Sequence, residues 1–549
     1  MRRVLTRSRS LVAAAGVLAT LAATATTLPV SSAAAAPPAA AAPRAAAAAA
    51  AGITWGECPT ATLQRFNAEC GSVSVPLDYS NPGGAKASIA VSRVKATAAP
   101  YKGPILVNPG GPGGSGLVYS IFQTFVNDGA GLNYDWIGFD PRGVGRSTPS
   151  LSCQPDFFQG PRPAYEPEGG QEQANITRSK QYAAACAANN NATLLNNMKT
   201  TDVARDMDEI RKALGAPTMS YLGFSYGTYL GQVYTELFPG RTDKVIMDGV
   251  VDPRHVFEQS NLDQDAAFER NIGLWFDWLA KYDSVYHLGT TRQQVSDLYY
   301  ATKDKLAANP AGGTIGSAEF ADIILYAGYY DSVWFTIADA FVAAVNGDAQ
   351  TLVDTYADFV GPGDDNGFAV YLAVQCTDAP WSSTYQAFRA SQVRTARQSP
   401  FLTWGNAWFN APCVFWPAPA GKPTTITGKG ASSALLISQT NDAATPYPGA
   451  VEVRRLFKGA SLVAEPGGTT HSGSFSGNEC TDGAIADYLR DGTLPTRRPG
   501  TGADRLCTPL PHPDPTSASG YEAGPPPVAP LKTKGASAYK VRGGPSVAQ

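Results

Sequence analysis

Six short apolar runs constrain the fold of this 549-residue chain more than any other feature of its sequence. Continuous apolar runs of this kind are typical of strands buried on both faces, as in a parallel sheet that helices cover. A helical pattern over residues 201–214 leads directly into the third run. The sequence therefore predicts an α/β fold built on a mostly parallel sheet. The six runs are 104–108, 136–140, 220–224, 244–248, 434–438 and 461–465.

Two other regions complete the predicted architecture. Apolar and polar residues alternate over 72–79 and 87–95, which predicts an antiparallel pair of opening strands. Between residues 251 and 430 the alternation of predicted strands with helical or loop segments does not continue. Helix-like segments there hold seven of the nine tryptophans. So many tryptophans in one segment favour a separate hydrophobic core for this insertion. We expect the sheet domain to comprise residues 52–253 and 431–507, interrupted by a helical cap insertion at 254–430.

The N-terminal residues 1–36 have the pattern of a secretory signal peptide. Four arginines precede an apolar run at 11–21, and small residues around 32–36 offer a cleavage site. The run is short and rich in Ala and Thr, so a retained N-terminal anchor is the weaker alternative. We expect a secreted, extracellular protein with no stable membrane anchor.

Low-complexity segments border the predicted folded region. Residues 37–51 are nearly all Ala and Pro, which is typical of a linker or of a removed pro-segment. Residues 508–549 are rich in Pro, Gly, Ser and Ala, and we expect this tail to be poorly ordered.

Charge and cysteine content exclude several classes of protein. With 43 basic and 46 acidic side chains, the chain has no surplus of positive charge with which to bind nucleic acid. Eight cysteines without a CxxC pair, together with only four histidines, favour disulfides in an exported chain and argue against a metal site. We expect neither a metal nor a cofactor. Pairing neighbours along the chain gives the shortest loops: Cys58–Cys70, Cys153–Cys186, Cys376–Cys413 and Cys480–Cys507.

The sharpest chemical signal is the G-x-S-x-G sequence at 223–227, placed between a predicted strand and a predicted helix. Both glycines are needed there because a Cβ on either side would collide in the tight turn. The turn lifts the Ser225 hydroxyl to the start of the helix, where the Tyr226 N–H can stabilise an oxyanion. This context predicts a nucleophilic serine.

The scarcity of histidine selects the base. A nucleophile elbow is followed along the chain by an acid and then a histidine. His255 and His287 fall in the insertion, and His512 lies in the proline-rich tail, where contact with an active site is not expected. His471 follows the last predicted strand in a glycine-rich loop, and it is the predicted base.

Asp442 lies just past the run 434–438, where the acid of such a triad is expected. It would hold the imidazole of His471 in the required tautomer and stabilise the imidazolium. Asp248 and Asp252, beyond the strand before the insertion, are the alternative acids.

A glycine-rich loop at 108–116 follows an early strand and is suited to bring backbone N–H groups close to a substrate oxygen. It lacks the lysine of a phosphate-binding loop, so phosphate binding is the weaker reading. The turn 140–147 that ends the next strand is interpreted as structural.

Together these segments resemble the prolyl aminopeptidase branch of the α/β-hydrolases. The residues that carry the resemblance are the loop 109–114 (PGGPGG), the turn 140–147 (DPRGVGRS), the elbow 223–227 (GFSYG) and the late Asp442 and His471. The signal peptide, the chain length and the C-terminal half rich in Cys and Trp are most similar to the secreted tripeptidyl aminopeptidases.

The resemblance implies an α/β-hydrolase fold and a serine exopeptidase that removes short peptides, often tripeptides, from a free N-terminus. It assigns Ser225, Asp442 and His471 as the triad and the N–H groups of Gly111 and Tyr226 as oxyanion donors. This chain has Pro109 where the family loop usually begins with histidine, a departure that affects the loop conformation more than the donor.

An aminopeptidase must also bind a protonated α-amine, and acidic residues of the insertion are the candidates. These are Glu258, Asp263, Asp265 and Glu269. A carboxylesterase or lipase would use the same triad with an apolar acyl pocket. An inactive hydrolase fold that serves as a binding protein, and a haloperoxidase-like enzyme, are more remote alternatives.

Overall fold

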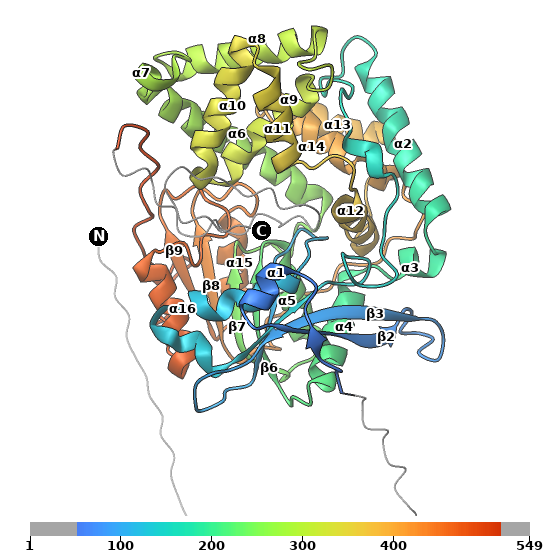
Figure 1. The fold of residues 1–549 in the computed structure, drawn as a ribbon, viewed down its shortest axis with the longest axis vertical. Helices are drawn as coiled ribbons and strands as arrows, with labels where there is room; N and C mark the ends of the chain where they lie inside the picture. The colour runs from blue at the N-terminus through green and yellow to red at the C-terminus, as the bar shows by residue number, and fades with distance from the viewer. Residues whose placement is uncertain (1–51, 518–549) are drawn as a thin grey trace, which may run out of the picture. The chain divides into compact units, whose positions relative to one another are not determined.

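The computed structural model describes residues 52–517. The predicted signal peptide (1–36), the Ala/Pro-rich leader (37–51) and the tail from residue 518 onward lie outside the described residues. The described residues contain a ten-stranded sheet and a large set of helices (Figure 1). Within them, no helix is both long enough and apolar enough to cross a membrane.

The sheet has the strand order β1-β2-β3-β5-β4-β6-β7-β8-β9-β10. The strands from β5 and β4 through to β10 pair in parallel, whereas β1, β2 and β3 add an antiparallel edge that joins β5. The predicted α/β fold with an opening antiparallel pair is therefore confirmed. The strands are β1 (Gly56–Glu57), β2 (Glu69–Pro76), β3 (Lys86–Val94), β4 (Pro104–Asn108), β5 (Asp135–Phe139), β6 (Met219–Phe224), β7 (Thr242–Asp248), β8 (Ala434–Gln439), β9 (Ala460–Glu465) and β10 (Arg505–Leu506).

The alternation of side chains along each strand builds two hydrophobic cores, one on each face of the sheet. Leu106 packs on the face covered by α4, α5 and α15, whereas Ile105 and Val107 pack on the face covered by η1 and α16. Each central strand is buried on both faces because helices cover both. These covering helices are α4 (Thr200–Ala213), α5 (Tyr226–Leu237), α15 (Pro448–Leu456), α16 (Glu479–Asp491) and the 3₁₀ helix η1 (Leu117–Phe125), with α1 (Ala61–Arg65) and η2 (Asn127–Asn133) at the edge.

The chain leaves the sheet after β7 and returns at β8, and the intervening helices form the cap (Figure 1). A third core, distinct from the two at the sheet, fills it, and Trp275 and Trp334 are fully buried there. The cap helices are α6 (Glu258–Lys281), α7 (Asp283–Tyr286), α8 (Arg292–Ala308), α9 (Ser317–Tyr329), η4 (Asp331–Val333), α10 (Trp334–Asn346), α11 (Ala349–Phe359), α12 (Asn366–Asp378), α13 (Tyr385–Ala396), α14 (Thr403–Asn410) and η5 (Ala411–Phe415).

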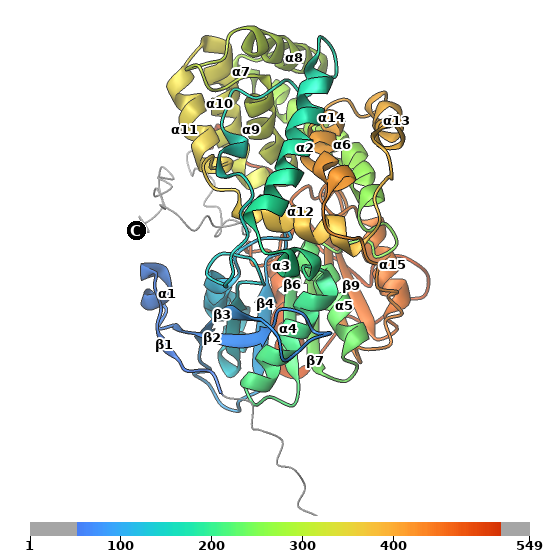
Figure 2. The ribbon, with the colours of Figure 1, turned by 90° about the vertical axis from the view of Figure 1, so that its right-hand side faces the viewer.

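A second segment outside the sheet, between β5 and α4, also packs against the cap. This differs from the expected assignment of all of 52–253 to the sheet domain. It contains η3 (Pro155–Phe158), α2 (Gln171–Asn189) and α3 (Ala192–Asn196), and α2 runs beside α14 (Figure 2). Arg162 bonds Glu319 and Asp322 of α9, at 2.7 and 2.6 Å. The difference arises because these polar side chains find their partners only in the folded cap.

Four disulfides join Cys58 to Cys70, Cys153 to Cys186, Cys376 to Cys413 and Cys480 to Cys507, which are the pairs of neighbours along the chain. The disulfide Cys153–Cys186 links the two ends of the segment that contains η3 and α2, and Cys376–Cys413 joins the end of α12 to η5. No group of three or more His, Cys, Asp or Glu side chains in residues 52–517 is arranged to hold a metal ion.

The expectation that the C-terminal tail is poorly ordered is wrong for its first ten residues. The Trp278 indole donates to the carbonyl of Pro513 at 2.8 Å, and the His512 ring stacks on Trp334 with 4.5 Å between centroids. Proline-rich composition does not prevent order here, because the cap offers aromatic surfaces on which these side chains pack.

Candidate active site

Ser225 occupies a sharp turn between strand β6 and helix α5. Its backbone has φ 55° and ψ −127°, outside the usual regions for a residue with a Cβ. Its N–H donates to the carbonyl of Asp248 at 3.0 Å, and its own carbonyl accepts from the N–H and hydroxyl of Thr228 at 2.8 and 2.7 Å. These bonds hold the strained turn at the helix N-terminus, as a nucleophile elbow requires.

The two glycines that flank the elbow are required by close backbone contacts. A Cβ on Gly223 would lie 2.5 Å from the carbonyl oxygen of Gly227, and a Cβ on Gly227 would lie 2.6 Å from that of Asn108. Neither approach is possible for a larger residue. The G-x-S-x-G pattern is therefore explained sterically.

His471 and Asp442 form a buried hydrogen-bonded pair. The Nδ1 of His471 lies 2.8 and 3.0 Å from the two carboxylate oxygens of Asp442. Asp442 also accepts from the N–H groups of Ala444 and Thr445, both at 2.9 Å, and from the Thr445 hydroxyl at 2.8 Å. With Nδ1 facing the acid, Nε2 is the ring nitrogen left to act as a base.

The electrostatics of this pair favour a charged imidazole. Burial alone lowers the pKa of His471, but the charge of Asp442 and its hydrogen bond outweigh burial, so the pKa lies above its ordinary value. Asp248 contributes in the same direction. The carboxylates thus stabilise the imidazolium that forms when the histidine accepts a proton.

Asp248, at the end of β7, connects the serine and histidine segments. Its carbonyl accepts from the Ser225 N–H, and its side chain accepts from the N–H of Ser474 at 2.8 Å. A Cβ on the next residue, Gly249, would lie 3.0 Å from the His471 ring. The serine turn and the loop that carries His471 therefore both lie against the end of strand β7. Asp442, and not Asp248, is the carboxylate within hydrogen-bond distance of Nδ1 of His471, and Asp252 instead pairs with Arg254 at 2.5 Å.

The glycine-rich loop after β4 lies against the elbow. A Cβ on Gly110 would lie 2.9 Å from the Ser225 Cβ and 3.0 Å from the Tyr226 nitrogen, which shows how closely the backbones approach. Gly110, Gly111 and Gly113 all have φ between 94° and 108°, where glycine is favoured. Gly111 is exposed, and the N–H of Tyr226 belongs to the first turn of α5, where helical N–H groups have no intrahelical acceptor.

The other three histidines lie away from the elbow. His255 pairs with Asp263 at 2.6 Å, and His287 ends helix α7. His512 contacts the cap, since its Nδ1 lies 3.2 Å from Asp331, and the same carboxylate accepts from the Thr470 hydroxyl at 2.6 Å. His512 is therefore linked to Thr470, the residue before His471, only through Asp331.

All four candidate amine-binding carboxylates have protein partners. Glu258 accepts from the N–H and hydroxyl of Ser382, both at 2.7 Å; Asp263 holds His255; and Glu269 accepts from the Phe401 N–H at 2.9 Å. The structure assigns them contacts within the cap.

Asp265 differs from the other three. It is fully buried, and one carboxylate oxygen accepts from the Asn406 amide at 2.9 Å, while the other has no hydrogen-bond partner in residues 52–517. Burial raises its pKa to about 7. Burial of a carboxylate oxygen that accepts no hydrogen bond costs free energy unless a donor binds to it.

Several residues that shape the site carry no signal in the sequence. The Tyr329 carbonyl accepts from the His471 N–H at 2.8 Å, and Gln439 accepts from the Thr470 N–H at 2.6 Å. Thr445 is the exception. Asp442 accepts from the N–H groups two and three residues later, which is a turn that can be recognised in a sequence.

Comparison with known proteins places this arrangement in a family. Residues 103–324 match the family model described as "alpha/beta hydrolase fold", and residues 399–503 match the model described as "TAP-like protein". The chain is 39% identical to the tripeptidyl aminopeptidase of Streptomyces lividans over 481 residues, which cover 85% of this chain and 88% of that protein. The chain belongs to the tripeptidyl aminopeptidase family.

Other relatives in this family have different names. Carboxylesterase B of Mycobacterium tuberculosis is 34% identical over 80% of this chain and 88% of that protein. Serine protease Hip1 of the same organism is 30% identical over 81% of this chain and 89% of that protein. The α/β-hydrolase fold predicted from the sequence is confirmed, and this member of the tripeptidyl aminopeptidase family is a serine hydrolase.

Proposed function

We propose that this chain is a secreted serine exopeptidase that hydrolyses peptide bonds near a free N-terminus and releases short peptides, as a tripeptidyl aminopeptidase does. The observation that carries the proposal is the convergence of the Ser225 elbow and the Asp442–His471 pair on the end of strand β7. The 39% identity to the Streptomyces lividans enzyme supports a peptide substrate in preference to other acyl compounds.

In the proposed reaction His471 takes the proton of Ser225 as its hydroxyl oxygen attacks the scissile carbonyl. The N–H groups of Gly111 and Tyr226 stabilise the oxyanion of the tetrahedral intermediate. The C–N bond then breaks, and the imidazolium of His471 gives its proton to the leaving amine. Water, activated by His471, attacks the acyl-enzyme and releases the N-terminal peptide together with the free serine.

Asp265 is the carboxylate that we assign to the substrate amine. An ammonium group would supply the donor that its second oxygen lacks, and the charge would favour ionisation of a group whose pKa burial raises to about 7. Its position supports this role, since the preceding residue, Gln264, donates to the carbonyl of Ala444, two residues after Asp442, at 2.7 Å. Helix α6 thus brings Asp265 close to the acid loop.

A panel of three substrates tests the peptidase assignment: a tripeptide anilide with a free amine, the same peptide N-acetylated, and a short-chain aryl ester. The proposal expects turnover of the free-amine peptide to exceed that of the acetylated peptide by about 100-fold or more, because the acetyl group removes the ammonium. Equal turnover of both peptides would refute the exopeptidase reading.

The same panel tests Asp265. Asp265→Asn is expected to raise KM for the free-amine peptide by about 10- to 100-fold and to leave ester hydrolysis within twofold. Asp263→Asn makes the same chemical change two residues earlier on α6 and serves as the matched control. Equal effects of the two substitutions would remove Asp265 from the amine site.

A carboxylesterase is the second candidate, because a relative of that name is 34% identical to this chain. It would use the same triad and would show turnover of the aryl ester alone. For secretion, the support is the signal-like pattern of residues 1–36 together with four disulfides, which persist in oxidising compartments. Mass spectrometry of the culture medium would detect a mature chain that begins after residue 36.

A further inference from the structure

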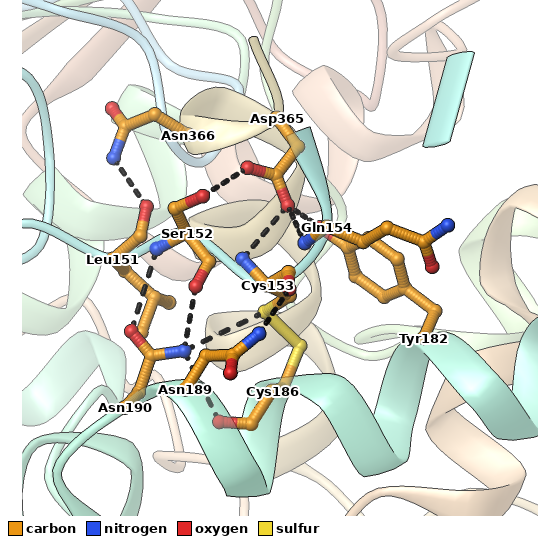
Figure 3. The surroundings of a disulfide bond; sticks show 10 residues. All are labelled: Leu151, Ser152, Cys153, Gln154, Tyr182, Cys186, Asn189, Asn190, Asp365 and Asn366. Carbon is orange, nitrogen blue, oxygen red and sulfur yellow. Dashed lines mark hydrogen bonds between the residues drawn. A yellow bond between two sulfur atoms is a disulfide. The ribbon is translucent and has the colours of Figure 1, made fainter. Parts of the chain in front are cut away.

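Helix α12 of the cap lies between the cap helices and the sheet (Figures 1 and 2), and both of its ends are fixed. Its N-terminal end is anchored by Asp365 beside the disulfide Cys153–Cys186 (Figure 3). The Asp365 carboxylate accepts from the N–H groups of Cys153 and Gln154 at 2.8 and 2.6 Å, and from the hydroxyls of Ser152 and Tyr182 at 2.6 and 2.8 Å. A carboxylate with four donors is held firmly.

The next residue, Asn366, ties α12 to the turn that follows strand β5. Its side chain accepts from the Gly145 N–H at 2.9 Å and donates to the carbonyls of Gly143 and Leu151 at 2.8 and 2.7 Å. At the far end of the helix, the disulfide Cys376–Cys413 joins α12 to η5. Helix α12 is therefore a fixed element in an otherwise separately packed cap.

The first turn of α12 rests on the glycine-rich loop. A Cβ on Gly113 would lie 2.2 Å from the carbonyl oxygen of Gly367 and 3.2 Å from the nitrogen of Tyr371, so the two backbones are in direct contact. A small pocket is lined jointly by the loop, the elbow and the helix, through Gly110, Pro112, Gly113, Tyr226, Val370 and Val374.

The last residue of α12 reaches the other proposed oxyanion donor through two hydroxyl groups. Asp378 accepts from the N–H of Thr200 at 2.7 Å and from its hydroxyl. Because the Thr200 hydroxyl donates to Asp378, it accepts the hydrogen bond that the Tyr226 hydroxyl forms with it at 2.7 Å. All three side chains are buried.

From these contacts we infer that α12 sets the geometry of the oxyanion hole, and that Thr200 and Asp378 are positioning residues that act through Tyr226. One helix is linked to the segment of each donor: Gly367 touches the loop that carries Gly111, and Asp378 bonds Thr200, which in turn bonds the Tyr226 side chain. The inference rests on the proposed roles of Ser225, Gly111 and Tyr226.

The physical consequence is confined to the transition state. Oxyanion donors act only when they lie within about 2.7–3.1 Å of the developing charge, so a small displacement weakens this interaction more than it weakens substrate binding. Loosening Tyr226 should therefore lower kcat and leave KM unchanged.

The test compares Thr200→Val, which keeps the shape and removes the hydroxyl, with Thr200→Ser, which keeps the hydroxyl. Each is assayed for kcat and KM on the free-amine tripeptide anilide and for inhibition by the matching peptide aldehyde. The hemiacetal that the aldehyde forms with Ser225 places an oxygen in the oxyanion hole, whereas the tripeptide product does not. Tyr226→Phe removes the other end of the same hydrogen bond and covers the case in which Thr200→Val fails to fold.

Thr200→Val and Tyr226→Phe are expected to lower kcat by about 5- to 30-fold, with KM and product inhibition within twofold and the aldehyde Ki raised by the same factor as kcat falls. Thr200→Ser should recover most of the activity. Tyr229→Phe, the same change on the next turn of α5, is the control and should be within twofold of wild type.

Two results would overturn the inference: wild-type kcat in both Thr200→Val and Tyr226→Phe, or equal losses for the aldehyde and the tripeptide product. Ser225→Ala separates this failure from failure of the proposed function. If Ser225→Ala is inactive and Tyr226→Phe is fully active, only the role of α12 is wrong; if Ser225→Ala retains activity, the proposed function itself is wrong.

Discussion

The two sides of the active site are held by different chemistry. On the serine side, the elbow and the glycine-rich loop are fixed by backbone contacts and hydroxyl groups, with Gly113 against Gly367 and Tyr226 against Thr200. On the histidine side, the loop that follows His471 is held by buried carboxylates. Asp248 accepts from the Ser474 N–H at 2.8 Å.

Two more carboxylates complete the histidine side. Asp482 accepts from the N–H groups of Phe475 and Gly477 at 2.7 and 2.9 Å, and Glu465 accepts from the side chain of Gln439, which in turn accepts from the Thr470 N–H. Burial raises the pKa of Asp248 to about 6 and that of Glu465 to about 7. Burial also raises the pKa of Asp378, on the serine side, to about 7, but this carboxylate acts on Tyr226 only through the Thr200 hydroxyl. On the histidine side, by contrast, Asp248 and Asp482 bond the loop directly.

The largest effect is expected from Asp442→Asn, on the histidine side. Loss of the acid removes the charge that stabilises the imidazolium, so kcat should fall by about 10³- to 10⁴-fold. Because Asp442 raises the pKa of His471, the acid limb of the residual activity should also move to lower pH. A pH–rate profile measures both effects. Asp252→Asn, the rival acid, should stay within twofold of wild type, and a large loss there would reverse the assignment.

On the serine side, Gly113→Ala should abolish most activity, by about 100-fold or more, because its Cβ would overlap the Gly367 carbonyl and its φ of 99° strains any larger residue. Gly367→Ala places a Cβ on the opposite side of the same contact, where only the Gly113 oxygen lies within 4 Å, at 3.7 Å. It should keep near-wild-type activity. Steady-state kinetics decide, and equal losses in both variants would show that the contact does not act sterically.

A moderate effect is expected for Glu465→Gln on stability as a function of pH. A carboxylate whose folded-state pKa is raised binds its proton more tightly when folded, so its contribution favours folding below about pH 4.5 and is lost as pH rises toward 7. Because glutamine does not titrate, the variant does not lose stability in this way as pH rises. Relative to wild type, its free energy of unfolding should rise by roughly 1–3 kcal/mol between pH 5 and 8. Urea unfolding at both pH values measures it, and parallel pH profiles would contradict the raised pKa.

The smallest effect is expected from His512→Ala in the tail. Loss of the stacking on Trp334 should lower the free energy of unfolding by about 0.5–1.5 kcal/mol and leave kcat within twofold. Thermal unfolding and kinetics measure the two quantities. A tenfold loss of kcat would contradict this expectation, and it would mean that His512 affects the position of His471 through Asp331 and Thr470.

The sequence was sufficient where local rules decide the outcome. The six apolar runs became central strands because a strand buried on both faces needs nothing but its own composition to be recognised. The elbow could be predicted because its glycines satisfy contacts within five residues and with one neighbouring strand. The scarcity of histidine then left His471 as the predicted base.

What the sequence did not predict depends on contacts between distant segments. Thr200 and Asp378 are 178 positions apart, and neither lies in a recognisable motif. Residues 155–190 join the cap through Arg162 and its partners on α9, and residues 508–517 pack on the cap through Trp278 and Trp334. Such pairings follow from the three-dimensional packing of the cap, which local patterns do not encode.

The central claim is that Ser225 is the nucleophile and that His471 activates it. Covalent labelling with a fluorophosphonate, followed by mass spectrometry of the digested protein, tests it most directly. We expect one label, on the peptide that carries Ser225, at a rate that falls together with activity in His471→Ala. A label on another residue, or an active enzyme that takes no label, would contradict it.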